Sequence, residues 1–174
     1  MKTRKILSIA ILAVAFFVGS NSFAQMTSKN IVEVAVGSKD HTTLVAAVKA
    51  AGLVETLSGK GPFTVFAPTN EAFNKLPKGT VESLLKPENL KTLQSILTYH
   101  VVAGKLDSKA VVAAITAGKG KVVLTTVQGA KLTASLKGEN VVLTDEKGNE
   151  AIVTAVDLDA SNGVIHVVDG VLMH

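Results

Sequence analysis

The chain has 174 residues, of which 47% are hydrophobic, with no cysteine, no tryptophan and a formal net charge of +4. This composition is typical of one globular domain, and it excludes a disordered chain, disulfides and thiolate metal sites. Lys2, Arg4 and Lys5 precede an apolar run, and setting them aside leaves 15 of the 18 basic residues against 14 acidic ones. Because this balance is nearly neutral, arginine is absent after Arg4 and aromatic side chains are few, we expect no nucleic-acid partner.

The first 24 residues have the organisation of a signal peptide. A basic start is followed by an apolar run over 6–19 and by a polar stretch that ends at Ala24. We expect cleavage near Ala24 and a secreted or periplasmic protein. A membrane anchor is disfavoured, because about 14 residues at 1.5 Å per residue are too short for ~30 Å of hydrocarbon. The mature chain, residues 25–174, is then one domain with no stable membrane anchor.

Residues 28–116 carry apolar side chains mainly at helical spacing. Asp40 is predicted to cap a helix that stops at Gly52, because short polar side chains bond the first N–H groups of a helix and glycine adopts the left-handed conformation that ends one. A further helix is predicted over 88–98, where leucine and isoleucine recur every three or four residues.

A buried strand is predicted at 63–66, where Phe-Thr-Val-Phe follows a Gly-Pro pair. Thr69 is then expected to cap a helix with Glu71 in its first turn, where the helix dipole stabilises an acidic side chain. A second strand is expected to begin near Tyr99.

Beyond Gly118 apolar side chains recur every two residues, which indicates half-buried strands. Glycines at 129, 138 and 148 separate short segments of this kind, as in an antiparallel meander. The predicted strands are 121–127, 130–137, 140–145 and 150–156, followed by a last strand at 164–172. Helices first and strands second indicate an α+β domain, and the mature chain is long enough for one core.

No pattern in the chain predicts catalysis. Cysteine nucleophiles are absent and no G-x-S-x-G turn exposes a serine, so we expect no enzyme and no cofactor. A metal site would favour two histidines at i and i+4, and no such pair exists among His41, His100, His166 and His174.

The segment Asp157-x-Asp159-x-Ser161 imitates the start of a calcium-binding loop. Its sixth position is Asn162, where such loops need glycine, and its twelfth is Val168, where they need a bidentate glutamate. We therefore expect a polar turn at this point and no metal.

Six polar residues stand in apolar surroundings, in predicted strands or at their edges: Thr69, Asn70, Tyr99, His100, His166 and Asp169. Burying a polar group without a partner costs about 1–3 kcal/mol. We expect these side chains to bond one another in a network that fixes the start of a helix to the sheet. A ligand site made by the same residues is the alternative.

Three blocks of sequence stand out: TVFAPTNEAF at 64–73, YHVV at 99–102 and NGVIHVVDGVLM at 162–173. In the same order, they resemble the first signature, the Tyr-His motif and the second signature of the fasciclin-like domain family of secreted and cell-surface adhesion proteins. The resemblance covers residues 28–173. It implies a wedge-shaped antiparallel β-sandwich with helices packed along its side, in which the two signature blocks lie close together.

The resemblance also implies a function. It suggests a non-catalytic exported adhesion or matrix-interaction module of a bacterium, which binds protein or polysaccharide at the cell surface. By this resemblance the binding residues are Tyr99 and His100, which match the Tyr-His motif, together with Asp157 and Leu158. The latter two match the Asp-Ile pair that animal relatives present for integrin contact, with leucine in place of isoleucine. A bacterial-type leader on a lone domain does not favour an integrin as the native partner.

Alternatives remain open for these residues and for the function. Tyr99 could fill the core at the helix-to-strand junction, and Asp157 could have no role beyond turning the chain before Asn162. A protein rich in valine, leucine and alanine could instead carry a small apolar ligand between helices and sheet in the periplasm. An unrecognised hydrolase would need activity that depends on His100 or His166.

Overall fold

The computed structural model describes residues 29–173, so the predicted signal peptide and His174 lie outside the described residues. The helices are α1 (Ile31–Val36), α2 (Thr42–Ala50), α3 (Val54–Ser58), α4 (Asn70–Asn74), α5 (Thr80–Leu84), α6 (Leu90–Tyr99) and α7 (Ser108–Ala117), with 3-10 turns η1 (Lys39–His41) and η2 (Pro87–Asn89). The strands are β1 (Phe63–Pro68), β2 (Val101–Ala103), β3 (Lys121–Thr125), β4 (Lys131–Lys137), β5 (Asn140–Thr144), β6 (Glu150–Ala160) and β7 (Gly163–Val168).

The strands lie in the order β2-β1-β7-β6-β5-β4-β3. The strand β6 is long enough to join two sheets, because its first residues pair with β5 and the rest pair with β7. A single β-bridge between Val102 of β2 and Thr126, the residue after β3, joins the first and last strands of this order. The predicted α+β sandwich is therefore confirmed. It departs from the expectation in one respect, because β1 and β7 run parallel.

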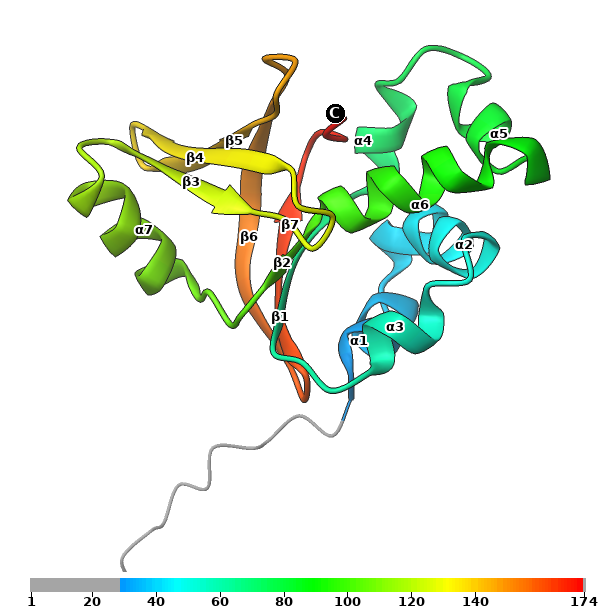
Figure 1. Cartoon of the computed structure of the whole chain (residues 1–174), viewed down its shortest axis with the longest axis horizontal. Helices are drawn as coiled ribbons and strands as arrows, with labels where there is room; N and C mark the ends of the chain where they lie inside the picture. Colours follow the sequence, from blue (N-terminus) through cyan, green and yellow to red (C-terminus); the bar gives the residue numbers. More distant parts are fainter. Residues whose placement is uncertain (1–28, 174) are drawn as a thin grey trace, which may run out of the picture.

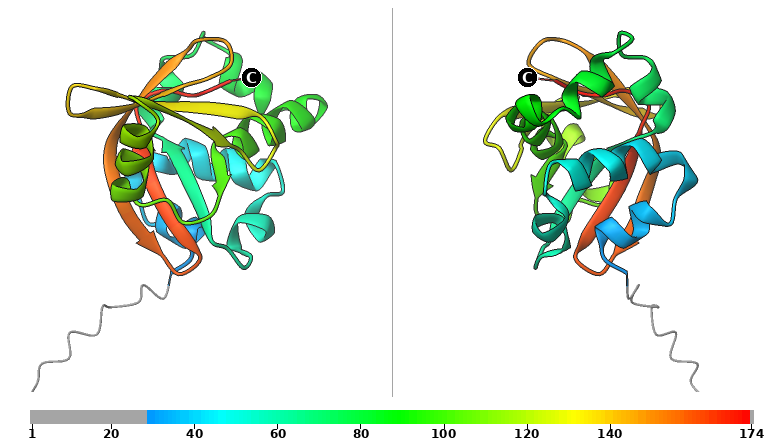
Figure 2. Two further views of the ribbon diagram at one scale, coloured as in Figure 1. Left: turned by 60° about the vertical axis from the view of Figure 1, so that its left-hand side comes forward. Right: turned by 90° about the vertical axis from the view of Figure 1, so that its right-hand side faces the viewer.

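The helices cover the strands from two sides. Figure 1 shows α1 to α6 on one side and α7 alone on the other, where α7 packs on β3 and β4. Figure 2 shows the same separation from two further directions, with α1 and α2 in front of β7 in its right-hand view. The chain reaches α7 through the loop that follows β2, so this loop crosses from the larger helical layer to the isolated helix.

The strand β1 is buried on both faces. Successive residues of a strand point to opposite sides, so Val65 and Ala67 face the core beneath α1, α2 and α6, whereas Phe66 faces the core between the sheets. A strand buried in this way needs apolar residues at consecutive positions, which is the pattern that predicted it. The strand β7 is buried along its whole length for the same reason.

The first and second signature blocks meet in space as expected. In the parallel pair, Val65 lies opposite Ile165 and Phe66 opposite His166. The rings of Phe66 and His166 stack with their centroids 5.6 Å apart and an angle of 26° between their planes. Two segments a hundred residues apart thus form the centre of the domain.

Several local predictions are confirmed. Gly52 follows α2 with a φ of +69°, and the side chain of Thr69 accepts the N–H of Ala72 as the cap of α4. The prediction for Asp40 was wrong, because Ser38 caps the 3-10 turn and α2 begins after it without a side-chain cap.

Several strand boundaries also differ. Tyr99 ends α6, and β2 begins only at Val101. The strand expected at 150–156 continues to Ala160, because β-bulges let β6 pass through the acidic segment that the sequence indicated as a turn. The last strand stops at Val168 rather than at residue 172, since Asp169 turns its side chain back to the N–H of Ile152.

Candidate functional site

His166 lies under the loop that leads to α7. It is 2% exposed, and its Nε2 lies 2.7 Å from the carbonyl oxygen of Leu106. Its Nδ1 accepts the backbone N–H of Asp157 at 3.4 Å. Because a carbonyl can only accept, the proton sits on Nε2 and Nδ1 is the acceptor. The imidazole of His166 therefore joins β7 to β6 and to the loop that precedes α7.

Asp157 secures the first turn of α7. Its Oδ1 accepts the backbone N–H of Ser108 at 2.7 Å, and its Oδ2 accepts the hydroxyl of the same serine. The residue has a φ of +58°, which side chains rarely adopt and which turns its carboxylate out of the strand toward the helix. Burial alone would raise the pKa of Asp157, but the hydrogen bonds from Ser108 and the positive charge of Lys109 hold it below its usual value.

Thr64 completes the attachment of this loop; it begins the first signature block, but no sequence pattern predicts a role for it. It is fully buried, and its hydroxyl donates to the carbonyl of Gly104 at 2.7 Å while it accepts the N–H of Leu106 at 2.8 Å. Side chains from β1, β6 and β7 thus hold residues 104–108. We call these three side chains, Thr64, Asp157 and His166, the α7 clamp.

Tyr99 and His100 are core residues. Their exposed fractions are 0% and 3%, and their rings meet edge to face. The hydroxyl of Tyr99 donates to the carbonyl of Lys131 at 2.8 Å, and burial raises the pKa of this hydroxyl above its ordinary value. The assignment of Tyr99 and His100 as binding residues is therefore corrected: neither side chain reaches the surface, because the end of α6 packs against both sheets.

His100 connects the end of α6 to the C-terminal segment. Its Nδ1 lies 2.8 Å from the carbonyl of Ile96, and its Nε2 accepts the N–H of Leu172 at 3.0 Å. Burial lowers the pKa of His100 to about 4, although the Ile96 carbonyl and the charge of Asp145 oppose this shift. The ring is neutral at physiological pH, and both nitrogens are used by the backbone.

Thr69 and Asn70 act at the start of α4, where Asn70 bonds residues on both sides of His41. The amide oxygen of Asn70 accepts the N–H of Thr43 at 3.0 Å and the hydroxyl of Thr42, and its Nδ2 donates to the carbonyl of Lys39 at 2.9 Å. Asn70 therefore joins α4 to the segment that leads into α2.

Asp169 joins β7 to β6 and to the end of α4. Its Oδ1 accepts the N–H of Ile152 at 2.7 Å, and its Oδ2 lies 3.0 Å from the ammonium of Lys75. Partial burial alone would raise the pKa of Asp169, but these two partners hold it below its ordinary value.

Within residues 29–173, no hydrogen bond joins Thr69, Asn70, His166 or Asp169 to another member of that set. The predicted network among them is corrected accordingly. Asn70, His166 and Asp169 bond backbone groups of segments far away in the sequence, whereas Thr69 bonds the N–H of Ala72 in its own helix. The backbone at loop and helix ends offers the unpaired donors and acceptors.

The second signature begins with Asn162 and Gly163, and each residue has a structural role there. The amide oxygen of Asn162 accepts the N–H of Ile31 at 2.9 Å, and its Nδ2 donates to the carbonyls of Leu57 and Gly59. A Cβ atom on Gly163 would lie 2.0 Å from the carbonyl oxygen of Phe63. The turn between β6 and β7 therefore fastens α1 and α3 and needs a residue without a side chain.

The arrangement does not activate a nucleophile. Ser108 gives its hydroxyl proton to Asp157 rather than to a histidine, and Nε2 of His166 is engaged by the carbonyl of Leu106. Among the described residues, no group of three or more histidine or acidic side chains could hold a metal ion. The chemistry of these side chains is that of structural hydrogen bonding.

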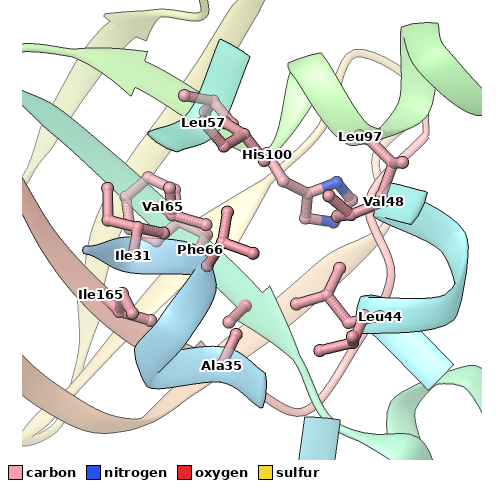
Figure 3. A pocket seen from close by; sticks show the side chains of 14 residues that line it. Ile31, Ala35, Leu44, Val48, Leu57, Val65, Phe66, Leu97, His100 and Ile165 are labelled. Atoms are coloured by element: carbon pink, nitrogen blue, oxygen red, sulfur yellow. The ribbon is translucent and has the colours of Figure 1, made fainter. Parts of the chain in front are cut away.

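An apolar cavity lies between the helices and the sheet, where the carrier alternative requires one. Figure 3 shows Ile31, Leu44, Val65 and Ile165 around it, contributed by α1, α2, β1 and β7. Its volume is about 40 Å³. Pockets for drug-sized ligands measure roughly 300–1,000 Å³, so only a very small molecule fits the described conformation.

The fold and these residues define a type of domain in which helices are fastened to a curled sheet by buried polar side chains. The fasciclin domain model matches residues 39–174, and the chain belongs to the fasciclin domain family. No helix within residues 29–173 has the length and apolar character needed to cross a membrane.

Two relatives illustrate this membership, and one solved structure shares the fold. The chain is 52% identical over 147 residues to Protein sll1483 of Synechocystis, covering 84% of this chain and 74% of that protein. It is 33% identical over 160 residues to the cell surface glycolipoprotein MPB83 of Mycobacterium bovis, covering 89% of this chain and 65% of that protein. A FAS1 domain pair from the insect cell adhesion molecule Fasciclin I has a solved structure that matches with a TM-score of 0.74 at 18% identity, over 85% of this chain and 52% of the solved one.

Proposed function

We propose that the protein is an exported, non-catalytic module that binds macromolecules, protein or polysaccharide, at the cell surface or in the matrix. Membership of the fasciclin family carries this proposal, because one relative is named as a cell-surface protein and another as a cell adhesion molecule. The use of the buried polar side chains supports it as well. They fasten loops and helices, which leaves the exposed surface for contacts.

We assign the contact to the exposed face of β6 around Leu158. This side chain is 40% exposed, and the next residue, Asp159, forms an ion pair with Lys105 at 2.8 Å. An apolar side chain beside charged ones is typical of the edge of a protein-binding surface. Asp157 contributes through the backbone shape that it imposes, since its carboxylate is occupied by Ser108.

A pull-down from the envelope fraction of the producing organism tests this surface. We expect Leu158→Asp to lose the captured partner, because it places a charge where an apolar contact is needed. Val123→Asp is the matched control, since Val123 is 54% exposed on β3 and lies on a different strand. Equal capture by the wild type and Leu158→Asp, or an equal loss in both variants, would contradict the assignment.

Export is tested separately, by cell fractionation. Leu12→Arg puts a charge into the apolar run of the predicted signal peptide, at a cost of about 2.5–3.5 kcal/mol in a membrane-inserted helix. We expect the variant to stay in the cytoplasm and the control Leu12→Ile to be exported. Undiminished secretion of Leu12→Arg would show that residues 1–24 are not the export signal.

Native mass spectrometry separates an adhesion module from a carrier. A carrier keeps a stoichiometric ligand through purification, whereas we expect the purified protein to have the mass of the chain alone and to bind envelope or matrix polymer. A retained ligand combined with no polymer binding would favour the carrier instead.

A further inference from the structure

Two cavities adjoin beneath α1. The first is the apolar cavity of Figure 3, and the second has a volume of about 30 Å³ and is bordered by His41 and Leu158. Ala35 of α1, Ala67 of β1 and Ile165 of β7 line both cavities.

His41 brings an unused polar atom to this space. The side chain is 5% exposed, and its Nδ1 lies 2.8 Å from the hydroxyl of Ser38. Its Nε2 makes no hydrogen bond among the described residues, although the backbone of Ala67 lies near the ring and opposes the lowering of its pKa by burial. The other two buried histidines, His100 and His166, use both ring nitrogens, so His41 is exceptional among them. Buried polar atoms in native proteins are seldom left without a partner, and an unpaired one calls for an explanation.

The neighbours of His41 restrict what could bind it. The hydroxyl of Ser38 accepts the N–H of Asp40 at 3.3 Å, and it can either donate to Nδ1 or accept from it. The Nε2 atom is therefore a donor in one tautomer and an acceptor in the other. A hydroxyl group suits both tautomers, because it can donate as well as accept.

We propose that the space beneath α1 is a binding site for a short-chain alcohol, whose hydroxyl bonds Nε2 of His41 and whose hydrocarbon part lies between Ala35, Ala67 and Ile165. The cavity that His41 borders, of about 30 Å³, exceeds the roughly 10–15 Å³ that one water needs, and it is smaller than the ~150 Å³ that accommodates benzene. The apolar walls favour a hydrocarbon over water in this part of the site. The site adjoins the surface contact proposed for Leu158, because that side chain borders the smaller cavity.

The helix α1 provides a route of entry. It has six residues, and the N–H of Ile31 bonds the side chain of Asn162 at 2.9 Å. A helix this short has little stability of its own and depends on its packing. Its brief displacement from β1 and β7 would open both cavities without disturbing the pairing of the strands.

Titration of the whole ¹⁵N,¹³C-labelled protein with 1-propanol tests the proposal by NMR. We expect saturable shifts of the Ala35 and Ala67 methyl signals, accompanied by a shift of the ring nitrogens of His41 while those of His100 stay unchanged. Shifts that rise linearly without saturation would overturn the proposal. Saturation with unmoved His41 nitrogens would overturn it too, since the space would then be only an apolar void.

Variants at two alanines distinguish a loss of binding at the site from a loss of folding. Ala35→Leu fills the space from α1, and we expect binding to weaken at least about tenfold while the dispersed amide spectrum is retained. Ala46→Leu is the matched control, because Ala46 is exposed on α2 and should leave binding unchanged. Equal affinity of Ala35→Leu and the wild type would place the alcohol elsewhere and refute the site.

Discussion

His166 and Asp157 face each other across β7 and β6, where the imidazole accepts the backbone N–H of Asp157 at 3.4 Å. The carboxylate of Asp157 points the other way and bonds the first residue of α7. The sequence predicted that His166 belongs to a structural network and that Asp157 belongs to a binding site. In the fold both belong to the α7 clamp, which ties an isolated helix to the strands.

Replacing His166 should weaken the whole domain. His166→Ala leaves the carbonyl of Leu106 and the N–H of Asp157 without partners, and it removes the ring that stacks on Phe66. We expect a loss of roughly 1–3 kcal/mol in the free energy of unfolding, measured by urea denaturation. An unchanged midpoint would mean that the histidine is solvated in solution.

Removing the Asp157 carboxylate should loosen α7 selectively. Asp157→Gly keeps the φ of +58° accessible but removes both bonds to Ser108, so we expect a loss of about 1 kcal/mol and faster amide hydrogen exchange in α7 than in α2. Asp159→Gly is the control, because a surface ion pair contributes little. Identical exchange in α7 for the two variants would show that the clamp does not hold the helix.

A methyl group at Gly163 should separate β1 from β7. The added Cβ of Gly163→Ala would lie 2.0 Å from the carbonyl oxygen of Phe63 and 2.9 Å from a methyl of Ile31. We expect a loss of roughly 3 kcal/mol or more, seen as a lower melting temperature. Gly37→Ala is the comparison, since its Cβ would meet only contacts of 3.5 Å and it should melt close to the wild type.

We expect the fold to require an amide side chain at position 162. Asn162→Asp keeps an acceptor for the N–H of Ile31 but turns a carboxylate oxygen toward the carbonyls of Leu57 and Gly59. We expect a loss of about 2 kcal/mol in unfolding experiments at neutral pH. Asn140→Asp, at an exposed position, should cost almost nothing, and a similar effect of the two changes would refute this role for Asn162.

Stability should fall as the pH drops from 6.5 to about 4. Burial lowers the pKa of His100 from 6.5 to about 4, so in this range the unfolded chain takes up a proton that the folded protein does not. The loss is about 3 kcal/mol when complete, and the lowered pKa of His41 adds to it in the same direction. Urea unfolding at several pH values measures it. His100→Gln should make the dependence shallower in this window, and an unaltered slope would contradict the assignment.

A second acid transition should follow at lower pH. Asp157 and Asp169 have lowered pKa values in the folded protein, so their stabilisation is present above the ordinary value of 3.8 and is lost as the pH falls below it. Asp169→Asn should reduce only this lower transition and leave the slope between pH 6.5 and 4 in place. If Asp169→Asn changed only the slope between pH 6.5 and 4, the transition at lower pH would belong to other groups.

Local patterns were sufficient for many elements. The apolar run at 63–66 predicted a strand buried on both faces, Thr69 and Gly52 marked the ends of helices, and the glycines at 129, 138 and 148 divided the meander. Each of these features depends on neighbours within a few residues, and the backbone conformation there is fixed by the same few side chains.

The residues that matter for function were placed less well from the sequence. Asp157 was expected in a turn or on a binding surface, and it stands in a bulged strand with its carboxylate occupied. Thr64 lies in the first signature block, but neither it nor Ser108 received a role from the sequence, because a threonine in a strand and a serine at a helix start are ordinary. Tyr99 and His100 are buried, as the core alternative for the tyrosine required.

The amino-acid sequence alone determined the α+β class, the family resemblance and the positions of most helices and strands, since periodicity and capping act over short distances. Only the tertiary structure decided that β1 and β7 run parallel and which groups satisfy the buried polar side chains. The partner of His166 is 60 residues away and that of Asn162 is 131 residues away. A pattern shows that a polar group will be buried, whereas its partner is whichever backbone group the folded chain brings within about 3 Å of it.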